Sequence, residues 1–238
     1  MTQPTIARVA LLLALCACLP AAAQEGDAPE PPPVELLGSA PQPGIPYFPL
    51  QRGRTWTFQT QVTVREAKAE TAGAPQTHKV EVTVAEPQRI DDKAVSVLEW
   101  KFDGSLAQRS FFFCTPDEVT CLRRIQGFGL EMRDFVLTEG QPVCREPLAV
   151  GQTWTWSGRV NAIKGEQKVK VAREETLETP AGSFECLVVE IEFTGEDDSK
   201  GKITRWLAKD VGIVKDLSEL KTAAVEVKSE GVLVRFKK

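Results

Sequence analysis

The sequence predicts an all-β protein built from an antiparallel, strongly curved sheet or a partly open barrel. Three observations predict this fold: apolar and polar residues alternate through most of residues 47–238, turn-forming residues separate the alternating runs, and one motif occurs twice. A period of two places alternate side chains on one face of a strand, whereas a helical stripe needs a period of 3.6. About ten strands with short connections are therefore expected.

Four runs carry the alternation most clearly. Their apolar residues are Trp56, Phe58, Val62 and Val64; Val80, Val82 and Val84; Leu98, Trp100 and Phe102; and Leu187, Val189, Ile191 and Phe193. Residues rich in Gly, Pro and Asp lie between runs at 71–75, 102–105, 179–182 and 195–201, which predicts turns there. Residues 216–224 fit either a short helix or another strand.

An internal repeat predicts that the fold consists of two related halves. Residues 49–57 (PLQRGRTWT) recur as residues 147–155 (PLAVGQTWT), with six of nine positions identical at an offset of 98. Residues 78–82 and 97–102 resemble residues 167–171 and 188–193, at offsets of 89 and 91. We expect halves at about 47–146 and 147–238, with one sheet running through both.

The first 46 residues have the pattern of an export signal and a tether. Residues 1–23 combine a weakly basic start, an apolar run and small residues before Gln24, which predicts a signal peptide cleaved after Ala23. Alternatively, residues 15–18 (LCAC) resemble a lipobox, in which Cys18 would be lipidated. The apolar run is too short to span a bilayer, and no second run of about 20 apolar residues follows.

Residues 24–46 contain 7 of the 16 prolines and no aromatic residue, which predicts a disordered linker. It would act either as a spacer that lifts the domain off a membrane or cell wall, or simply as a disordered leader.

The remaining four cysteines, Cys114, Cys121, Cys144 and Cys186, predict disulfide bonds. An even number of cysteines in an exported chain favours disulfides over metal ligation, and no C-x-x-C motif indicates a zinc or redox site. Residues 111–114 and 121–123 read as two strands joined by a turn, which places Cys114 opposite Cys121. Cys144 and Cys186 then pair by elimination.

Composition excludes several functional classes. The net charge of −4, with both signs interleaved, argues against nucleic acid as a partner. A single histidine excludes most His-based metal and acid–base sites, and no P-loop or dinucleotide-binding pattern is present. The carboxylate pairs at 91–92 and 197–198 fall in predicted turns, and Ser183 lacks a G-x-S-x-G context. We therefore expect no catalytic residues, no metal and no cofactor.

Three tryptophans are the candidate ligand-binding residues. Trp56, Trp154 and Trp156 could stack on sugar rings if they were exposed. However, Trp56 and Trp154 occupy equivalent positions of the repeat, which favours a packing role. Trp100 and Trp206 lie in apolar strands and are expected in the core.

Three motifs resemble those of a broad group of uncharacterised bacterial exported proteins and lipoproteins. Residues 47–56 (YFPLQRGRTW), 179–187 (TPAGSFECL) and 206–215 (WLAKDVGIVK) are similar to that group's YxPLxxGxxW, TPAGxFxxxxVE and W-[YL]-A-x-x-[VI]-G-x-[VI]-K patterns. The resemblance implies an all-β envelope domain of unknown function, and it brings no catalytic residues. A looser fold-level analogy is to curved half-barrels that carry lipids and lipoproteins across the periplasm.

Together these observations predict a non-enzymatic, extracytoplasmic protein of the cell envelope, either in the periplasm, secreted, or membrane-anchored as a lipoprotein. Its curved sheet would bind an apolar ligand or an envelope component. The first alternative is a carbohydrate-binding module that uses exposed tryptophans. The second is a hydrolase, which would need several polar groups converging in one pocket.

Overall fold

The computed structural model describes residues 43–67, 69–128 and 132–238, and within these residues all regular secondary structure is β. The all-β prediction is therefore confirmed. The predicted signal peptide (1–23), Cys18 and nearly all of the predicted linker (24–46) lie outside the described residues. In the described part of the chain, no helix has the length and apolar character needed to cross a membrane.

The strands alternate with short turns along the sequence. The first eight are β1 (Gly44–Ile45), β2 (Phe48–Pro49), β3 (Thr55–Glu66), β4 (Gln76–Val84), β5 (Gln88–Ile90), β6 (Lys93–Phe102), β7 (Ser105–Cys114) and β8 (Glu118–Gln126). They are followed by β9 (Arg133–Arg145), β10 (Thr153–Val160), β11 (Ile163–Thr179), β12 (Gly182–Gly195), β13 (Lys200–Ala208), β14 (Gly212–Lys221) and β15 (Val225–Lys237). Residues 216–221 belong to β14, so the strand alternative for this segment is correct.

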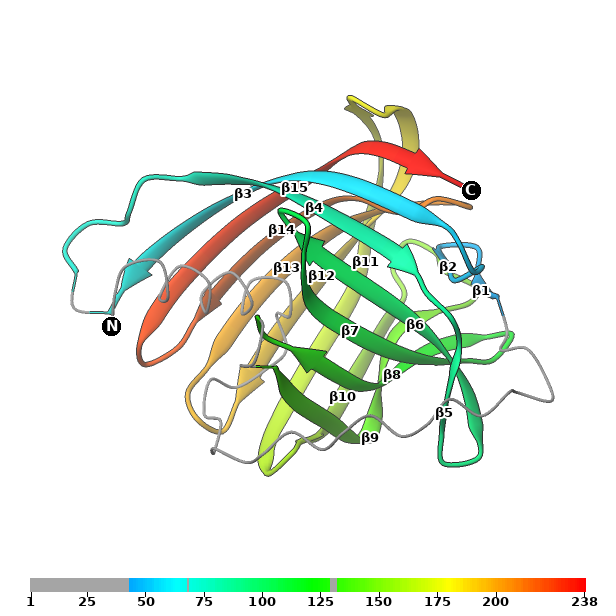
Figure 1. The fold of residues 1–238 in the computed structure, drawn as a ribbon, viewed down its shortest axis with the longest axis horizontal. Helices are drawn as coiled ribbons and strands as arrows, with labels where there is room; N and C mark the ends of the chain where they lie inside the picture. Colours follow the sequence, from blue (N-terminus) through cyan, green and yellow to red (C-terminus); the bar gives the residue numbers. More distant parts are fainter. Residues whose placement is uncertain (1–42, 68, 129–131) are drawn as a thin grey trace.

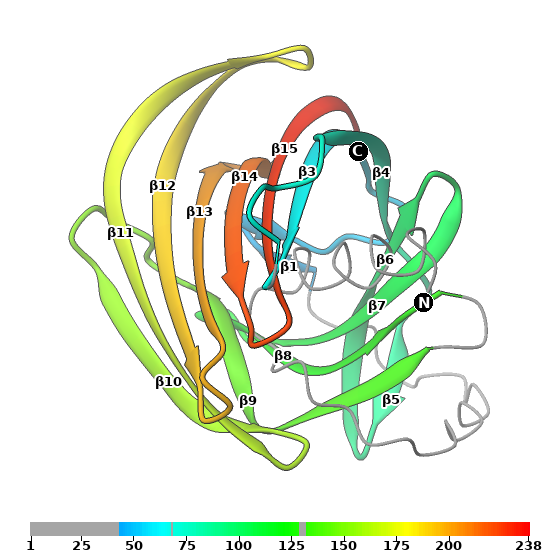
Figure 2. The same cartoon turned by 90° about the vertical axis from the view of Figure 1, so that its left-hand side faces the viewer.

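Among the described strands, twelve form one antiparallel sheet that closes on itself (Figures 1 and 2). Their order is β4-β3-β15-β14-β13-β12-β11-β10-β9-β8-β7-β6, and β6 returns to β4. The closing contact runs from the pair Val80↔Phe102 to the pair Val84↔Leu98. The short β5 pairs only with one end of β6. A ring of this kind leaves few unpaired strand edges.

Alternate side chains of each strand point into the ring, as the sequence pattern predicts. In β10, Trp154, Trp156 and Val160 are buried, whereas the intervening Thr153 and Thr155 are exposed. The main core is therefore the interior of the barrel. A second, smaller cluster of Val95, Val97 and Phe111 on β6 and β7 packs separately, with Ile90 of β5 against it.

One end of the barrel, which we call the hairpin end, carries most of the irregular structure. It holds β1 and β2, the two repeated Pro-Leu-x-x-Gly turns and the tip of the β11–β12 hairpin (Figure 1). Residues 176–185 of that hairpin pair only with one another, because β10 and β13 end before them. Figure 2 shows this tip extending past the neighbouring strands.

The predicted halves each supply six strands of the ring, and the repeated turns have the same backbone structure. The Gly53 N–H donates to the Val84 carbonyl oxygen at 3.0 Å. At the equivalent place, the Gly151 N–H donates to the Val171 carbonyl oxygen at 2.8 Å. The two glycines have φ angles of 86° and 90°, in the left-handed region. The repeat in the sequence is thus also a repeat of local structure.

One offset of the repeat differs from the sequence comparison. Trp56 pairs with Val82, and Trp154 pairs with Val169 in the other half. Val82 therefore corresponds to Val169, two residues from the predicted equivalent, Val171. A period-two pattern looks the same after a shift of two residues, so the sequence could not distinguish these registers. The offset of 91 predicted for the following strand is confirmed.

The repeated glycines give a first prediction. Gly53→Ala and Gly151→Ala should each destabilise the protein by roughly 1–2 kcal/mol, because an L-residue in the left-handed region is strained. A Cβ at either position would meet no atom within 4 Å, so the loss comes from the backbone. Thermal unfolding should show a Tm lower by about 2–8 °C.

Gly201→Ala is the matched control. A Cβ there would lie 3.5 Å from its nearest neighbour, which is an ordinary contact. The Tm of the Gly201→Ala variant should therefore differ little from that of the wild type. An unchanged Tm in both turn variants would refute the conformational requirement.

Candidate functional site

The β1–β2 hairpin lies across part of the hairpin end and is fixed to the barrel. The Asp210 N–H donates to the Pro46 carbonyl oxygen at 2.8 Å, which joins the hairpin to the β13–β14 turn, and the Leu50 N–H donates to the Pro43 carbonyl oxygen at 2.7 Å, which closes the base of the hairpin. Ile45 and Leu50 are buried in the core cluster. The hairpin is therefore part of the packed structure, and it brings β2 to the mouth of the barrel.

An apolar recess lies beside this hairpin. Its wall consists of Phe48 and Pro49 of β2, Trp56 and Phe58 of β3, Val82 of β4, Leu98 and Trp100 of β6, and Gly212 and Ile213 of β14. It contains about 360 Å³ of space free of protein atoms, the part open to solvent included. No ionisable side chain contributes to this wall, so the recess suits hydrocarbon or aromatic groups.

A second, polar recess lies next to the first, inside the ring. Its polar residues are Gln108 and Ser110 of β7, Arg124 of β8, Gln141 of β9, Gln167 of β11 and Arg205 of β13. Because these strands lie on different sides of the ring, the recess is within the barrel interior. It contains about 580 Å³ of space free of atoms, again including space open to solvent. Phe48, Trp100 and Ile213 line both recesses.

A row of hydrogen bonds crosses the polar recess. Arg124 Nη2 donates to Gln141 Oε1 at 2.6 Å, and Gln141 Nε2 donates to Gln167 Oε1 at 2.5 Å. The three residues are 8 %, 1 % and 4 % exposed, respectively, so these polar groups are held inside the protein. Buried polar groups are costly unless they are hydrogen-bonded, and this row meets part of that requirement.

Arg205 adds a second guanidinium to the same recess. Its Nε donates to Asp216 Oδ2 at 2.9 Å, and the two residues face each other across β13 and β14. Gln108 donates to the Ser110 hydroxyl oxygen at 2.6 Å. The polar recess thus combines charged and neutral hydrogen-bonding groups next to an apolar wall.

The three candidate tryptophans are buried, which contradicts their use as exposed sugar-stacking rings. Trp56, Trp154 and Trp156 are 7 %, 5 % and 6 % exposed. They face inward because the period-two pattern places them among the apolar residues of β3 and β10. Trp56 lines the apolar recess, whereas the two tryptophans of β10 do not contribute to that wall. A buried ring has no free face for a sugar, so this alternative is set aside.

Both predicted disulfides are wrong, because all four described cysteines are free. Cys114 lies opposite Val119, and Cys121 lies opposite Phe112, so the members of the predicted Cys114–Cys121 bond are displaced by two residues along the hairpin. The turn between β7 and β8 is shorter than the sequence predicts, since β8 already begins at Glu118.

The predicted Cys144–Cys186 bond fails for a different reason. Cys144 lies on β9 and Cys186 on β12, with β10 and β11 between them in the ring. Neighbouring strands are about 4.8 Å apart, whereas bonded cysteines need Cβ atoms about 3.8 Å apart. Pairing by elimination assumed that every cysteine has a partner.

The other polar candidates show no convergent site. His78 Nδ1 lies 2.8 Å from Asp103 Oδ2, next to the β6–β7 turn. The 91–92 and 197–198 carboxylate pairs occupy turns, as predicted. Within the described ranges, no group of three or more His, Cys, Asp or Glu residues could hold a metal ion.

The seam between β9 and β10 is held mainly by side chains. Only Val160↔Leu137 forms a regular pair there. Glu139 Oε2 accepts the Arg159 N–H at 2.7 Å, in place of a backbone carbonyl. The ring is therefore closed at this seam without a continuous backbone ladder.

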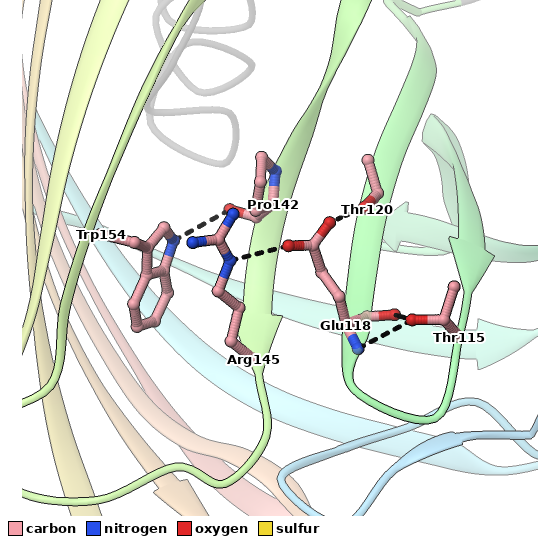
Figure 3. Close-up of polar contacts among 6 residues, drawn as sticks. All are labelled: Thr115, Glu118, Thr120, Pro142, Arg145 and Trp154. Atoms are coloured by element: carbon pink, nitrogen blue, oxygen red, sulfur yellow. Dashed lines mark hydrogen bonds and ion pairs between the residues drawn. The ribbon is translucent and has the colours of Figure 1, made fainter.

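Near the hairpin end of the seam, one side chain bridges the two strands (Figure 3). Trp154 Nε1 donates to the Pro142 carbonyl oxygen at 3.4 Å. On the other side of β9, Arg145 Nε donates to Glu118 Oε2 at 2.7 Å, and the Thr120 hydroxyl donates to Glu118 Oε1 at 2.7 Å. The Arg145–Glu118 bond joins β9 to β8, and the Thr120 hydroxyl, also on β8, holds the Glu118 carboxylate in place. With eight residue pairs to β8 and one to β10, β9 is anchored more strongly to β8.

Comparison with known proteins supports the resemblance seen in the motifs. Residues 163–222 match the family described as DUF3108-like. This segment contains the motifs at 179–187 and 206–215, and the resemblance to an uncharacterised family is thereby confirmed. No curated protein matches the chain.

Several solved structures are similar to this chain. A candidate exported protein with a YmcC-like fold from Bacteroides fragilis NCTC 9343 has 20 % identity and a TM-score of 0.46, covering 81 % of this chain and 99 % of that one. A candidate lipoprotein from Parabacteroides distasonis ATCC 8503 has 14 % identity and a TM-score of 0.42, covering 82 % and 100 %. The hypothetical lipoprotein YmcC from Escherichia coli K12 has 12 % identity and a TM-score of 0.34, covering 73 % and 83 %.

The cysteines give a second prediction. Burial raises the pKa of the Cys114 and Cys144 thiols to about 12 and that of Cys186 to about 11, so all three stay protonated at neutral pH. Because the thiolate is the reactive form, alkylation of the native protein should leave these cysteines and the buried Cys121 unmodified.

Peptide mass spectrometry should then show all four modified once the protein is unfolded in denaturant without reductant. A disulfide-linked peptide containing any of the four would contradict the structure.

The seam gives a third prediction. Backbone amides of β10 should exchange with deuterium at least tenfold faster than those of β3, because β3 has ladders on both sides whereas β10 has an extended ladder only with β11. Hydrogen exchange of peptides covering 153–160 and 55–66 measures the difference.

Peptides from β12, which is paired on both sides, serve as the control and should resemble β3. Equal protection of β10 and β3 would show that the seam is as stable as a regular ladder.

Proposed function

We propose that this protein is a non-enzymatic, extracytoplasmic binding protein of the cell envelope that holds an apolar ligand inside its barrel. The observation that carries the proposal is the apolar recess at the hairpin end. Concave sites lined mainly by aromatic and aliphatic side chains are the usual form of small-molecule sites in proteins. In this protein such a concave apolar site lies at the mouth of a closed barrel.

The chemistry of the wall supports binding rather than catalysis. Aromatic and aliphatic residues such as Phe48, Trp56 and Leu98 supply shape and hydrophobic contact, and they offer no general acid, base or nucleophile. The interior is partly filled by the protein's own aromatic side chains, which restricts the ligand to a slender group.

The sequence supports the location. The predicted signal peptide, the proline-rich linker and the resemblance to exported proteins and lipoproteins all favour a position outside the cytoplasm. Lipidation at Cys18 would anchor the barrel to a membrane, whereas cleavage after Ala23 would release it. In either case the ligand would come from the envelope or its surroundings.

A fourth prediction tests the proposal. The protein should bind N-phenyl-1-naphthylamine, a neutral probe whose fluorescence rises in apolar surroundings. Ile213→Trp should weaken that binding at least tenfold, because Ile213 lines both recesses and the larger ring would fill the space they share. A fluorescence titration measures the affinity.

Val136→Trp is the matched control. Val136 is 49 % exposed on β9, so a tryptophan there adds the same ring without entering the interior. Circular dichroism confirms that both variants keep their strands. Absence of probe binding to the wild type, or equal affinity in a folded Ile213→Trp variant, would overturn the proposal.

A further inference from the structure

We infer that the ligand is an acidic amphiphile whose anionic head group lies in the polar recess and whose hydrocarbon chain lies in the apolar recess. This inference rests on the proposed function, because it places the apolar part of the ligand in the same recess. It adds the chemical class of the ligand and its orientation in the barrel.

The first argument is that the two recesses adjoin. Phe48 of β2, Trp100 of β6 and Ile213 of β14 are part of both walls. One elongated molecule can therefore contact the apolar wall with one end and the polar wall with the other. A wholly apolar ligand would leave the polar groups facing hydrocarbon, which is unfavourable.

The second argument is the charge of the polar wall. Two guanidinium groups, from Arg124 and Arg205, contribute to it, whereas no carboxylate of the described residues does. Asp216 lies outside this wall but offsets the charge of Arg205, so the excess positive charge of the wall comes from Arg124. Guanidinium groups bind carboxylate and phosphate oxygens in a planar, charge-assisted geometry, and low solvent access strengthens that attraction. An anionic head group is therefore the complement of this wall.

The third argument is the supply of hydrogen-bond donors. The Arg124–Gln141–Gln167 row fixes one edge of the Arg124 guanidinium, which orients the group within the recess. The indole N–H of Trp100, at the border of both recesses, is buried and makes no hydrogen bond within the described residues. A head group that consists only of acceptor oxygens matches such donors better than a hydroxyl or an amine does.

The orientation follows from the positions of the residues that the two recesses do not share. The polar side chains come from β7, β8, β9, β11 and β13 inside the ring. The residues found only in the apolar wall include Pro49 of β2 and Trp56, near the start of β3, at the hairpin end. The head group would thus be held inside the barrel, and the hydrocarbon chain would run toward the mouth beside Phe48. This arrangement buries the charge where the guanidinium groups are.

Displacement of N-phenyl-1-naphthylamine by four compounds tests the inference. Decanoic acid and decyl phosphate should displace the probe from the wild type at concentrations at least tenfold lower than 1-decanol, which has the same chain and no charge. Inorganic phosphate should not displace it at these concentrations, because it has no chain. Comparison of the two anions distinguishes a carboxylate from a phosphate head group.

A matched pair of variants locates the effect. Arg124→Met should abolish the preference for the anions over 1-decanol while leaving the affinity for 1-decanol within about threefold of the wild type. Arg109→Met is the control, because Arg109 on β7 pairs with Glu99 at 2.8 Å and is not part of either recess. It should keep the preference.

Each outcome is decisive. If the anions and 1-decanol displace the probe equally well from the wild type, or if none of the three displaces it, the inferred ligand class is wrong, whereas apolar binding stands. Absence of probe binding to the wild type overturns the proposed function as well. A preference that survives in a folded Arg124→Met variant shows that the head group is not held in the polar recess.

Discussion

The hydrogen bonds between β6 and β4 turn a long curved sheet into a ring, and the width of that ring determines what the interior can hold. Barrels of about eight strands are filled by their own side chains, and the diameter grows with strand number. A twelve-strand ring of described residues therefore encloses more space than aliphatic side chains alone fill. Large residues such as Trp56, Trp156 and Arg124 occupy much of it, and the two recesses are the remainder.

This constraint also explains why charged groups are found inside. A wide lumen filled entirely by apolar groups would need more bulk than the inward positions supply. Long polar side chains such as Arg124 and Gln141 reach across the space and bond to each other instead. Their burial costs free energy, which hydrogen bonds offset in part. A buried polar row that is expensive for stability is readily understood if it also contributes to binding.

The sequence predicted strands and their inward faces well, because both follow from a local period of two. Register was not predictable in the same way. The equivalent of Val82 and the residue opposite Cys114 were each misplaced by two residues, the smallest shift that leaves a period-two pattern unchanged. The predicted Cys114–Cys121 bond failed with the register, whereas the predicted Cys144–Cys186 bond failed because two strands separate its members.

The polar recess could not be predicted from local patterns either. Arg124 and Gln141 occupy inward positions of β8 and β9, where an alternating pattern leads one to expect apolar residues. Their polarity makes them look like outward-facing residues, and the bond that joins them links separate strands. Polar residues at inward-facing positions of otherwise apolar strands were the sequence feature that could have indicated the polar recess. These residues come together only when the ring closes, and the sequence of a single strand does not predict that closure.

The two junctions between the halves of the ring are unequal. The junction of β15 and β3 has twelve residue pairs, from Val225↔Glu66 to Lys237↔Thr55, whereas that of β9 and β10 has one. The better-paired junction joins strands far apart in the sequence, and the poorly paired one joins strands connected by residues 146–152. A short covalent connection already keeps β9 and β10 together at little entropic cost, while β15 and β3 must be brought together across nearly the whole domain. The two halves of the barrel are thus joined in two different ways. A short covalent connection joins them at β9 and β10, and a long ladder of backbone pairs joins them at β15 and β3.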